Sequence, residues 1–217
     1  MPETPATDAA RPLRADKARN RAALIAAAQD VFAQEGLDAS MERVAARAGV
    51  GVGTLYRHFA SRADLWVVVL EEPLKRHLAL VEGALAEADP WIALRDYLEA
   101  SCAAEADRAG YSNLLTTDLS ISPQLLPIRS AIQRGIERLV RRARASGVVR
   151  SDFAAEDLMF LTVSNSRVIE LTRDIAPNAW RRNLALFLDA IRPREGETER
   201  SSPMTARQVY EVMVRPR

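Results

Sequence analysis

Residues 44–59 read V-A-A-R-A-G-V-G-V-G-T-L-Y-R-H-F, and this stretch decides the fold class. The small side chains of Ala45 and Ala48 allow a second helix to cross closely, and Gly49 supplies the positive φ that a sharp turn between helices requires. Apolar residues on both sides of the turn can fill a small core beneath the crossing. The stretch therefore predicts two short helices, about 40–48 and 52–58, joined by a glycine turn.

The sequence before this stretch predicts a longer helix. Residues 17–34 carry apolar side chains at steps of three and four, which is typical of an amphipathic helix. Gly36 is suited to end that helix, and Ser40 can cap the free amides of the next one. We expect a compact three-helix unit over residues 17–62, preceded by a flexible arm over residues 1–16.

Polar side chains gather at the end of the second short helix, at Tyr56, Arg57 and His58. A helix that lies in the major groove of DNA passes the phosphate backbone with such donors. The alternative is a glycine loop that holds a nucleotide phosphate. That alternative is disfavoured because no Gly-x-x-x-x-Gly-Lys-Ser/Thr order and no βαβ frame is present.

Residues 48–65 match the pattern A-G-V-x-x-G-T-L-Y-x-H-F-x-S-[K/R]-x-x-L, and residues 17–65 resemble the TetR family of transcriptional regulators. The resemblance implies that the second short helix is the DNA-recognition helix, with Val52 facing base edges. It also implies phosphate contacts from a set of polar side chains: Thr54, Tyr56, His58 and Arg62.

Two positions depart from the family pattern. Arg62 stands where lysine is commoner, which is a mild change because a guanidinium binds phosphate at least as well. Gly51 stands where the family often has a serine cap. With Val52 and Gly53 behind it, the front of the recognition helix has few groups for reading bases, so DNA shape or residues such as Arg43 and Arg47 can carry more of the specificity.

Net charge is distributed unevenly. The whole chain carries a formal charge of only +1, whereas residues 11–62 hold nine Arg and Lys against five Asp and Glu. The basic excess therefore lies on the predicted DNA-binding unit, where it supplies affinity for phosphates.

Several other classes of protein are disfavoured by composition. The single Cys102 excludes an intramolecular disulfide framework, and no signal peptide or 18-residue apolar run is present. We expect a soluble, cytoplasmic protein with no membrane partner. Only two histidines exist, and no metal pair or nucleophile motif surrounds them, so we expect no enzyme, metal or cofactor.

Residues 63–192 predict a larger helical domain. Helices are expected at about 61–85, with a kink or break at Pro73, and at 90–110, 113–119, 123–146, 154–174 and from Pro177 onward. We expect the arginines of 123–146 to face solvent. The alternative is that they form a second surface that binds nucleic acid. Within residues 193–217 we expect a polar strap, followed by either a short amphipathic helix or disorder.

The last two core helices of this domain have broad apolar stripes. Such stripes are suited to pair with a second copy in a symmetric four-helix interface, and the family resemblance implies the same arrangement. The residues predicted at this homodimer interface are Leu161, Val168, Trp180, Leu184, Phe187, Leu188 and Ile191.

The family resemblance also implies an effector site between the helices of this domain. We expect a small hydrophobic molecule, neutral or weakly acidic, in a mostly apolar cavity with a few hydroxyls. Ordinary core packing is the alternative for each candidate. The candidates are Tyr97, Ser101, Cys102, Thr117, Met159, Thr162 and Ser166.

Together these observations predict an all-α protein with an N-terminal helix-turn-helix domain and a larger effector-binding and dimerisation domain. The function they favour is that of a DNA-binding repressor, released from a double-stranded DNA operator by an unknown small molecule. The alternative is an activator or a helical interaction adaptor that uses the same DNA-binding domain without a small ligand.

Overall fold

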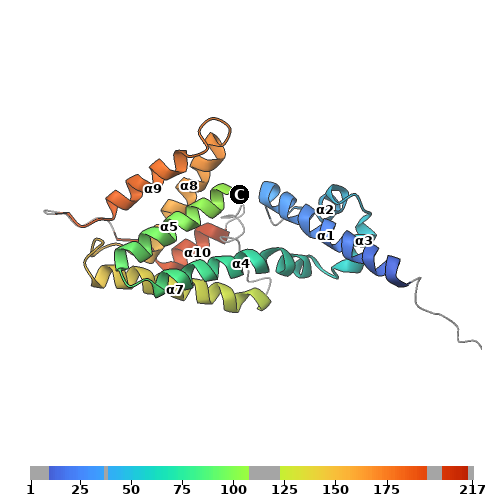
Figure 1. Ribbon diagram of the computed structural model, residues 1–217, viewed down its shortest axis with the longest axis horizontal. Coiled ribbons are helices and arrows are strands. Elements are labelled where there is room, and N and C mark those ends of the chain that lie inside the picture. The colour runs from blue at the N-terminus through green and yellow to red at the C-terminus, as the bar shows by residue number, and fades with distance from the viewer. Residues whose placement is uncertain (1–9, 37–38, 108–122, 195–201, 215–217) are drawn as a thin grey trace, which may run out of the picture. The chain divides into compact units, whose positions relative to one another are not determined.

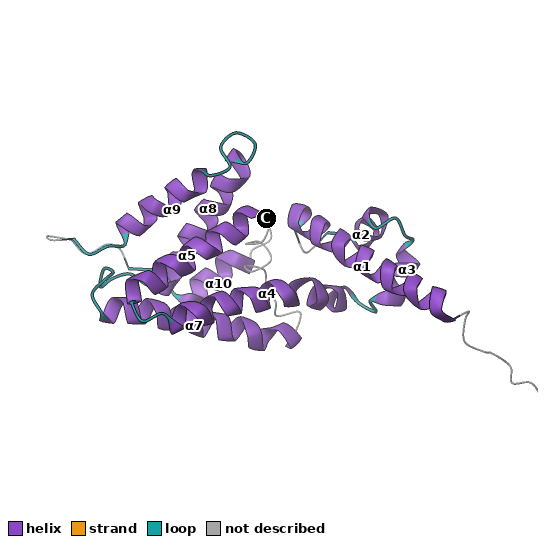
Figure 2. Ribbon diagram, in the orientation of Figure 1, coloured by secondary structure: helices purple, strands orange, loops and turns teal. Residues whose placement is uncertain are grey.

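The computed structural model describes residues 10–36, 39–107, 123–194 and 202–214, and all regular structure in these residues is helical (Figures 1 and 2). The all-α prediction is confirmed. The chain divides into two compact units, Met1–Leu70 and Glu71–Arg217.

The first unit contains α1 (Ala10–Glu35), α2 (Met41–Arg47) and α3 (Val52–His58). Its core is built from the apolar stripe of α1 and from one side of α2 and α3. The most deeply buried side chains of this core are Leu24, Ala28, Phe32, Val44 and Leu55. One expectation is corrected, because α1 already begins at Ala10, inside the segment expected to be a flexible arm. The alanines and arginines there favour helix, and a proline is tolerated in a first turn.

The turn between α2 and α3 follows from local chemistry. The Ser40 hydroxyl accepts a hydrogen bond from the Arg43 amide at 3.2 Å, which caps the start of α2. Gly49 has φ +70°, and the Val50 amide donates to the Ala45 carbonyl at 3.0 Å. Together these bonds end α2 with a left-handed glycine, as predicted.

The helix α4 (Arg62–Ala86) begins with a reciprocal cap. The Ser61 amide donates to the Asp64 carboxylate at 2.9 Å, and the Asp64 amide donates to the Ser61 hydroxyl at 3.2 Å. The helix continues through Pro73, so the break considered at that residue does not occur.

In the second unit, α5 (Pro90–Asp107) packs against α7 (Leu126–Ala145), α8 (Leu158–Thr172) and α9 (Ala179–Ala190). Short 3-10 turns, η2 (Pro123–Leu125) and η3 (Ala155–Asp157), precede α7 and α8. The helices α8 and α9 lie side by side (Figure 1). The core between these helices includes Leu94, Leu98, Leu139, Ala143 and Leu184.

The end of the chain contains α10 (Ala206–Val214). Of the two alternatives for this region, the short helix is present. The helix expected at 113–119 and the end of α5 at Gly110 lie outside the described residues.

Two side chains of α7 depart from a simple division into an apolar and a basic face. Leu126, at the start of the helix, is 41% exposed. Arg142, predicted to face solvent, donates to the carbonyls of Leu85 at 3.1 Å and Ala84 at 3.4 Å. These carbonyls lie in the last turn of α4, where carbonyl groups have no amide donor within the helix. The Arg142 guanidinium supplies hydrogen-bond donors to them. Arg134, Arg138, Arg141 and Arg144 are exposed as expected.

At Gly135 the helix α7 packs closely against α4. A methyl group built on Gly135 would lie 2.2 Å from Cγ1 of Val81, which is itself fully buried. We expect Gly135→Ala to lower the unfolding free energy by about 2 kcal/mol, because overpacking forces the two helices apart. Chemical denaturation measures this, with Gly83→Ala as the control, since the added methyl there meets no atom within 4 Å. Equal stability of the two variants would contradict the tight contact.

Candidate nucleic-acid interface and ligand pocket

The helix α3, which the sequence predicts to be the DNA-recognition helix, exposes one of its faces. Val52 is 37% exposed and Tyr56 is 47% exposed. Residues four apart lie on the same side of a helix, so these two side chains form one outward surface. Gly51 at the N-cap makes no side-chain hydrogen bond, and Gly53 is exposed. The front of α3 is therefore apolar and bare, as its sequence predicts.

Polar groups lie at the rear of α3. The Arg57 guanidinium donates to the Thr54 hydroxyl at 3.0 Å and to the Gly53 carbonyl at 3.3 Å, so it folds back along its own helix. The side chains of Thr54, His58 and Arg62 are half-buried. The predicted phosphate-binding residues thus lie on and directly after α3, with Tyr56 the most exposed of them.

The two arginines of α2 are engaged within the protein. Arg43 pairs with Glu35, and Arg47 pairs with Asp30 at 2.9 Å. Both acids belong to α1, so the pairs connect α2 to α1. Their guanidinium groups are more than half exposed, and such surface pairs contribute little to stability. Either arginine has to leave or share its carboxylate before it can contact DNA.

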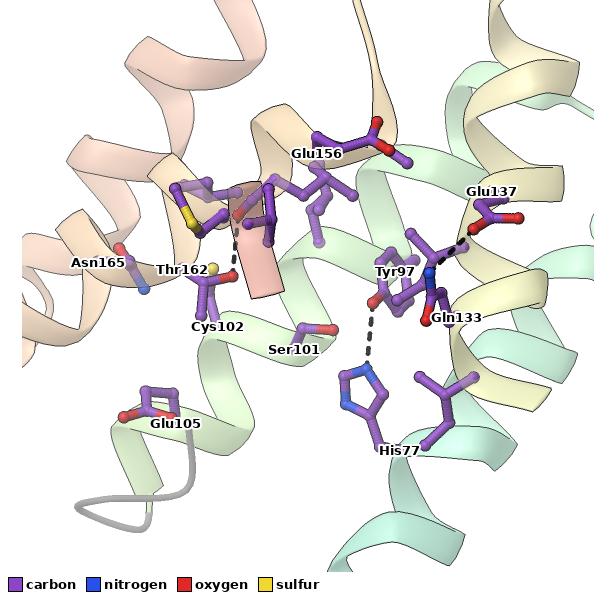
Figure 3. Close-up of a pocket in the computed structure, with 18 of the residues that line it drawn as sticks. His77, Tyr97, Ser101, Cys102, Glu105, Gln133, Glu137, Glu156, Thr162 and Asn165 are labelled. Carbon is purple, nitrogen blue, oxygen red and sulfur yellow. Dashed lines mark hydrogen bonds between the residues drawn. The ribbon is translucent and has the colours of Figure 1, made fainter. Parts of the chain in front are cut away.

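The second unit contains a cavity of about 330 Å³ between α4, α5, α7, η3, α8 and α10 (Figure 3). This volume is at the lower end of the range typical of small-molecule sites. Six of the seven predicted ligand-binding residues line it, and the seventh, Thr117, lies outside the described residues. The six are Tyr97, Ser101, Cys102, Met159, Thr162 and Ser166.

The polar lining of this pocket starts with a histidine–tyrosine pair. His77 Nε2 lies 3.1 Å from the Tyr97 hydroxyl, and the two rings meet edge to face. Burial lowers the pKa of His77 to about 4, so its imidazole is neutral near pH 7. Burial, with Glu105 and Glu99 nearby, raises the pKa of the Cys102 thiol to about 12.

Sequence reasoning missed several polar residues of the pocket, of which His77, Glu105 and Asn165 are the most deeply buried. Glu105 accepts a hydrogen bond from Ser166 at 3.4 Å. Asn165 is only 2% exposed although it lies in the middle of an apolar helix. That unusual polar position was a detectable signal in the sequence. His77 and Glu105 gave no comparable signal, because the neighbours that bury them are distant in sequence.

The residues predicted at the dimer interface differ in their burial. Leu161, Trp180, Leu184 and Ile191 are at most 5% exposed within the chain's own core. Val168, Phe187 and Leu188 are half-buried. The large apolar side chains that α8 and α9 expose are Phe160, Val163, Leu171 and Leu186. Both helices are therefore apolar on two sides, and only one of these sides is buried within the chain.

Comparisons with known proteins agree with this two-part architecture. Residues 24–68 match the model of bacterial regulatory proteins of the tetR family, and residues 89–193 match the C-terminal domain of SbtR-like transcriptional regulators. The TetR transcriptional regulator SCO0520 of Streptomyces coelicolor is 32% identical, with 80% of this chain and 98% of that chain covered and a TM-score of 0.50. The chain belongs to the TetR family of transcriptional regulators.

Two further matches either cover a short segment or share lower sequence identity. An HTH-type transcriptional regulator of Staphylococcus aureus strain USA300 is 40% identical over 63 residues, which are 29% of this chain and 34% of that protein. The match therefore spans about a third of the length of such relatives. The regulator KstR2 of Mycobacterium tuberculosis is 21% identical with a TM-score of 0.63, covering 80% of this chain and 95% of that chain, and shares the fold.

Two further findings concern the described residues of this TetR-family chain. None of their helices is long and apolar enough to span a bilayer. They contain no group of three or more His, Cys, Asp or Glu side chains placed to hold a metal ion.

Proposed function

We propose that this TetR-family protein is a homodimeric repressor that binds a DNA operator and releases it when a small molecule enters the pocket of the second unit. The observation that carries the proposal is the exposed α3 surface of Val52 and Tyr56, together with an internal pocket lined by α4. An activator or adaptor without a ligand has no use for such a pocket.

In the proposed complex, α3 enters the major groove and its rear contacts the backbone. Val52 faces base edges, while Tyr56 and the groups around Arg62 hold phosphates, which fixes the position of the helix on DNA. Gly53 has no side chain, and no protein atom lies within 4 Å of the position a Cβ would take. The backbone of α3 can therefore approach DNA closely at this residue.

Dimerisation is supported by the exposed apolar faces of α8 and α9. Phe160, Val163 and Leu171 are 46–61% exposed and recur on one face of α8, and Leu186 of α9 is 53% exposed. Soluble proteins rarely leave such a surface uncovered. A copy of the same two helices related by a two-fold axis forms a four-helix interface, which presents two α3 helices to successive major grooves.

Release by a small molecule is supported by the position of α4 along the chain. This helix contributes Leu74 and His77 to the pocket and begins at Arg62, next to the phosphate-binding residues. A ligand that prefers one position of α4 shifts the population of DNA-competent dimers by the difference in its affinity for the two states.

The DNA-binding proposal is tested with Tyr56→Phe and Val52→Ala. We expect Tyr56→Phe to weaken binding about tenfold on all operator variants, because it removes a phosphate contact that carries no sequence information. Val52→Ala should instead change the preference at one base pair. Both effects are measured by fluorescence anisotropy. The DNA is a set of overlapping fragments from the region upstream of the protein's own gene, followed by point variants of the fragment that binds. A sequence-selective loss for Tyr56→Phe would contradict the assignment.

The effector proposal is tested by a thermal-shift screen of metabolites and antibiotics, followed by DNA release. A stabilising compound binds the folded state, and its effect grows with concentration above its dissociation constant. Compounds that stabilise the protein and dissociate the DNA complex support the proposal. Stabilising compounds that leave DNA binding unchanged contradict the release step.

A further inference from the structure

Among the buried polar atoms that line the pocket, one on α5 and one on α8 have no hydrogen-bond partner among the described residues. They are the amide nitrogen of Asn165 and the hydroxyl oxygen of Ser101. Both residues line the pocket, and Asn165 is 2% exposed. Native proteins pair nearly all buried polar groups, so each exception requires an explanation.

The orientation of the Asn165 amide is set by a neighbouring helix. Its oxygen accepts a hydrogen bond from the Asn183 amide at 3.2 Å, and Asn183 also donates to Ser164 at 3.3 Å. With the oxygen engaged by α9, the nitrogen is on the side of Cys102 and Thr162 (Figure 3). Asn165 therefore presents hydrogen-bond donors to the pocket.

Several other polar side chains of the pocket already make hydrogen bonds within the protein. His77 bonds with Tyr97, Ser166 donates to Glu105, and Gln133 donates to Glu137 at 3.2 Å. The Thr162 hydroxyl donates to the Leu158 carbonyl at 2.9 Å. Asn165 and Ser101 thus offer a ligand one donor group and one hydroxyl.

The charge of the lining disfavours an anionic ligand. Three glutamates line the pocket, at 105, 137 and 156, against one arginine, Arg129. A ligand carboxylate brought among these acids would meet like charges. A ligand ammonium can pair with these glutamates, yet it leaves the Asn165 nitrogen, which only donates, without an acceptor. The group that fits Asn165 is an uncharged acceptor, and a carbonyl oxygen is the simplest one.

The pocket also has a long axis along α5. Tyr97, Ser101 and Glu105 recur every four residues on one side of this helix, a rise of about 12 Å from first to last. His77 lies at the Tyr97 end, and Ser166 lies at the Glu105 end, next to Asn165 in the chain. Apolar side chains, among them Ile132, Ile136 and Met159, line the space between.

We propose that the ligand is an uncharged, elongated apolar molecule with a ketone or ester carbonyl that accepts a hydrogen bond from the Asn165 amide nitrogen. A second oxygen, where the ligand has one, pairs with the Ser101 hydroxyl. This inference rests on the proposed function, because it assigns the chemistry of the molecule that the pocket receives.

The test uses ten-carbon probes that differ only in the end group: 2-decanone, decanoate and decylamine. We expect the wild-type protein to bind 2-decanone at least about tenfold more tightly than the two charged probes, by isothermal titration calorimetry. Asn165→Leu should reduce this preference at least about fivefold by weakening 2-decanone binding alone. Thr172→Val is the matched control, because it removes a hydroxyl of the same helix that lies outside the pocket and donates to the Val168 carbonyl at 2.7 Å.

Folding of the variant is checked by its thermal midpoint. Asn165→Leu removes a buried donor without a partner together with one acceptor of the Asn183 amide, which keeps its bond to Ser164, so its midpoint without ligand should stay close to that of the wild type. A merely structural role for Asn165 predicts a lower midpoint and an equal loss for all three probes, which would overturn the proposal. Tighter binding of decanoate or decylamine, or no binding of 2-decanone, would also overturn it.

Failure of the ligand class is distinguishable from failure of the repressor mechanism. Release of the DNA complex is measured for each probe that binds. Binding of 2-decanone through Asn165 without DNA release supports the ligand class and contradicts the release step. Release by decylamine alone contradicts the ligand class and supports the release step.

Discussion

Replacing Phe160 with glutamate is expected to dissociate the homodimer and to abolish tight operator binding. Phe160 is 53% exposed on the face of α8 that also carries Val163 and Leu171. A carboxylate in this position has to lose its hydration when two copies meet across this face. We expect the dimer dissociation constant to rise at least about a hundredfold.

Sedimentation velocity at low micromolar concentration measures the dissociation, and anisotropy with operator DNA measures its consequence. The two should change together, because a single α3 helix contacts only one half-site. Leu126→Glu is the control. Leu126, like Phe160, is an exposed apolar residue, at 41%, but it lies on α7. A Phe160→Glu protein that remains dimeric would place the interface elsewhere.

The second large effect concerns stability at mildly acidic pH. Burial depresses the pKa of His77 to about 4, whereas an unfolded histidine titrates near 6.5. As the pH falls below 6.5, the unfolded chain binds a proton that the folded protein refuses. The unfolding free energy therefore decreases between pH 6.5 and pH 4, and His77 accounts for about 3 kcal/mol of this decrease.

This contribution is isolated with His77→Gln, whose amide can replace the hydrogen bond to Tyr97 but cannot titrate. Urea denaturation at several pH values should show that the difference between wild type and variant is constant above pH 7 and shrinks as the pH falls toward 4. A wild-type slope in His77→Gln would show that another group is responsible.

The sequence was most informative where structure depends on local chemistry. The ends of α3, the left-handed Gly49 and the reciprocal cap of Ser61 and Asp64 each depend on residues within a few positions of one another. The seven-residue α3 is too short to be stable alone, yet its boundaries were predictable, because a glycine turn and a flanking core residue define them.

Features that depend on distant parts of the chain were not predictable. The helix α8 is apolar on both the Leu161 side and the Phe160 side, so periodicity cannot tell which side packs inward. Arg142 resembles a solvated arginine until the end of α4 is brought beside it. The pocket hydroxyls could be predicted from their position among apolar residues. The orientation of the Asn165 amide could not, because the residue that engages its oxygen, Asn183, lies on α9.

Cys102 is the only thiol of the protein and lies inside the pocket. Because its pKa is about 12, very little of the reactive thiolate is present at neutral pH, and a bound molecule blocks access to what remains. The chain therefore contains a built-in chemical probe. The rate at which maleimide labels this sulfur reports how often the pocket opens and whether it is filled, without any engineered dye or tag.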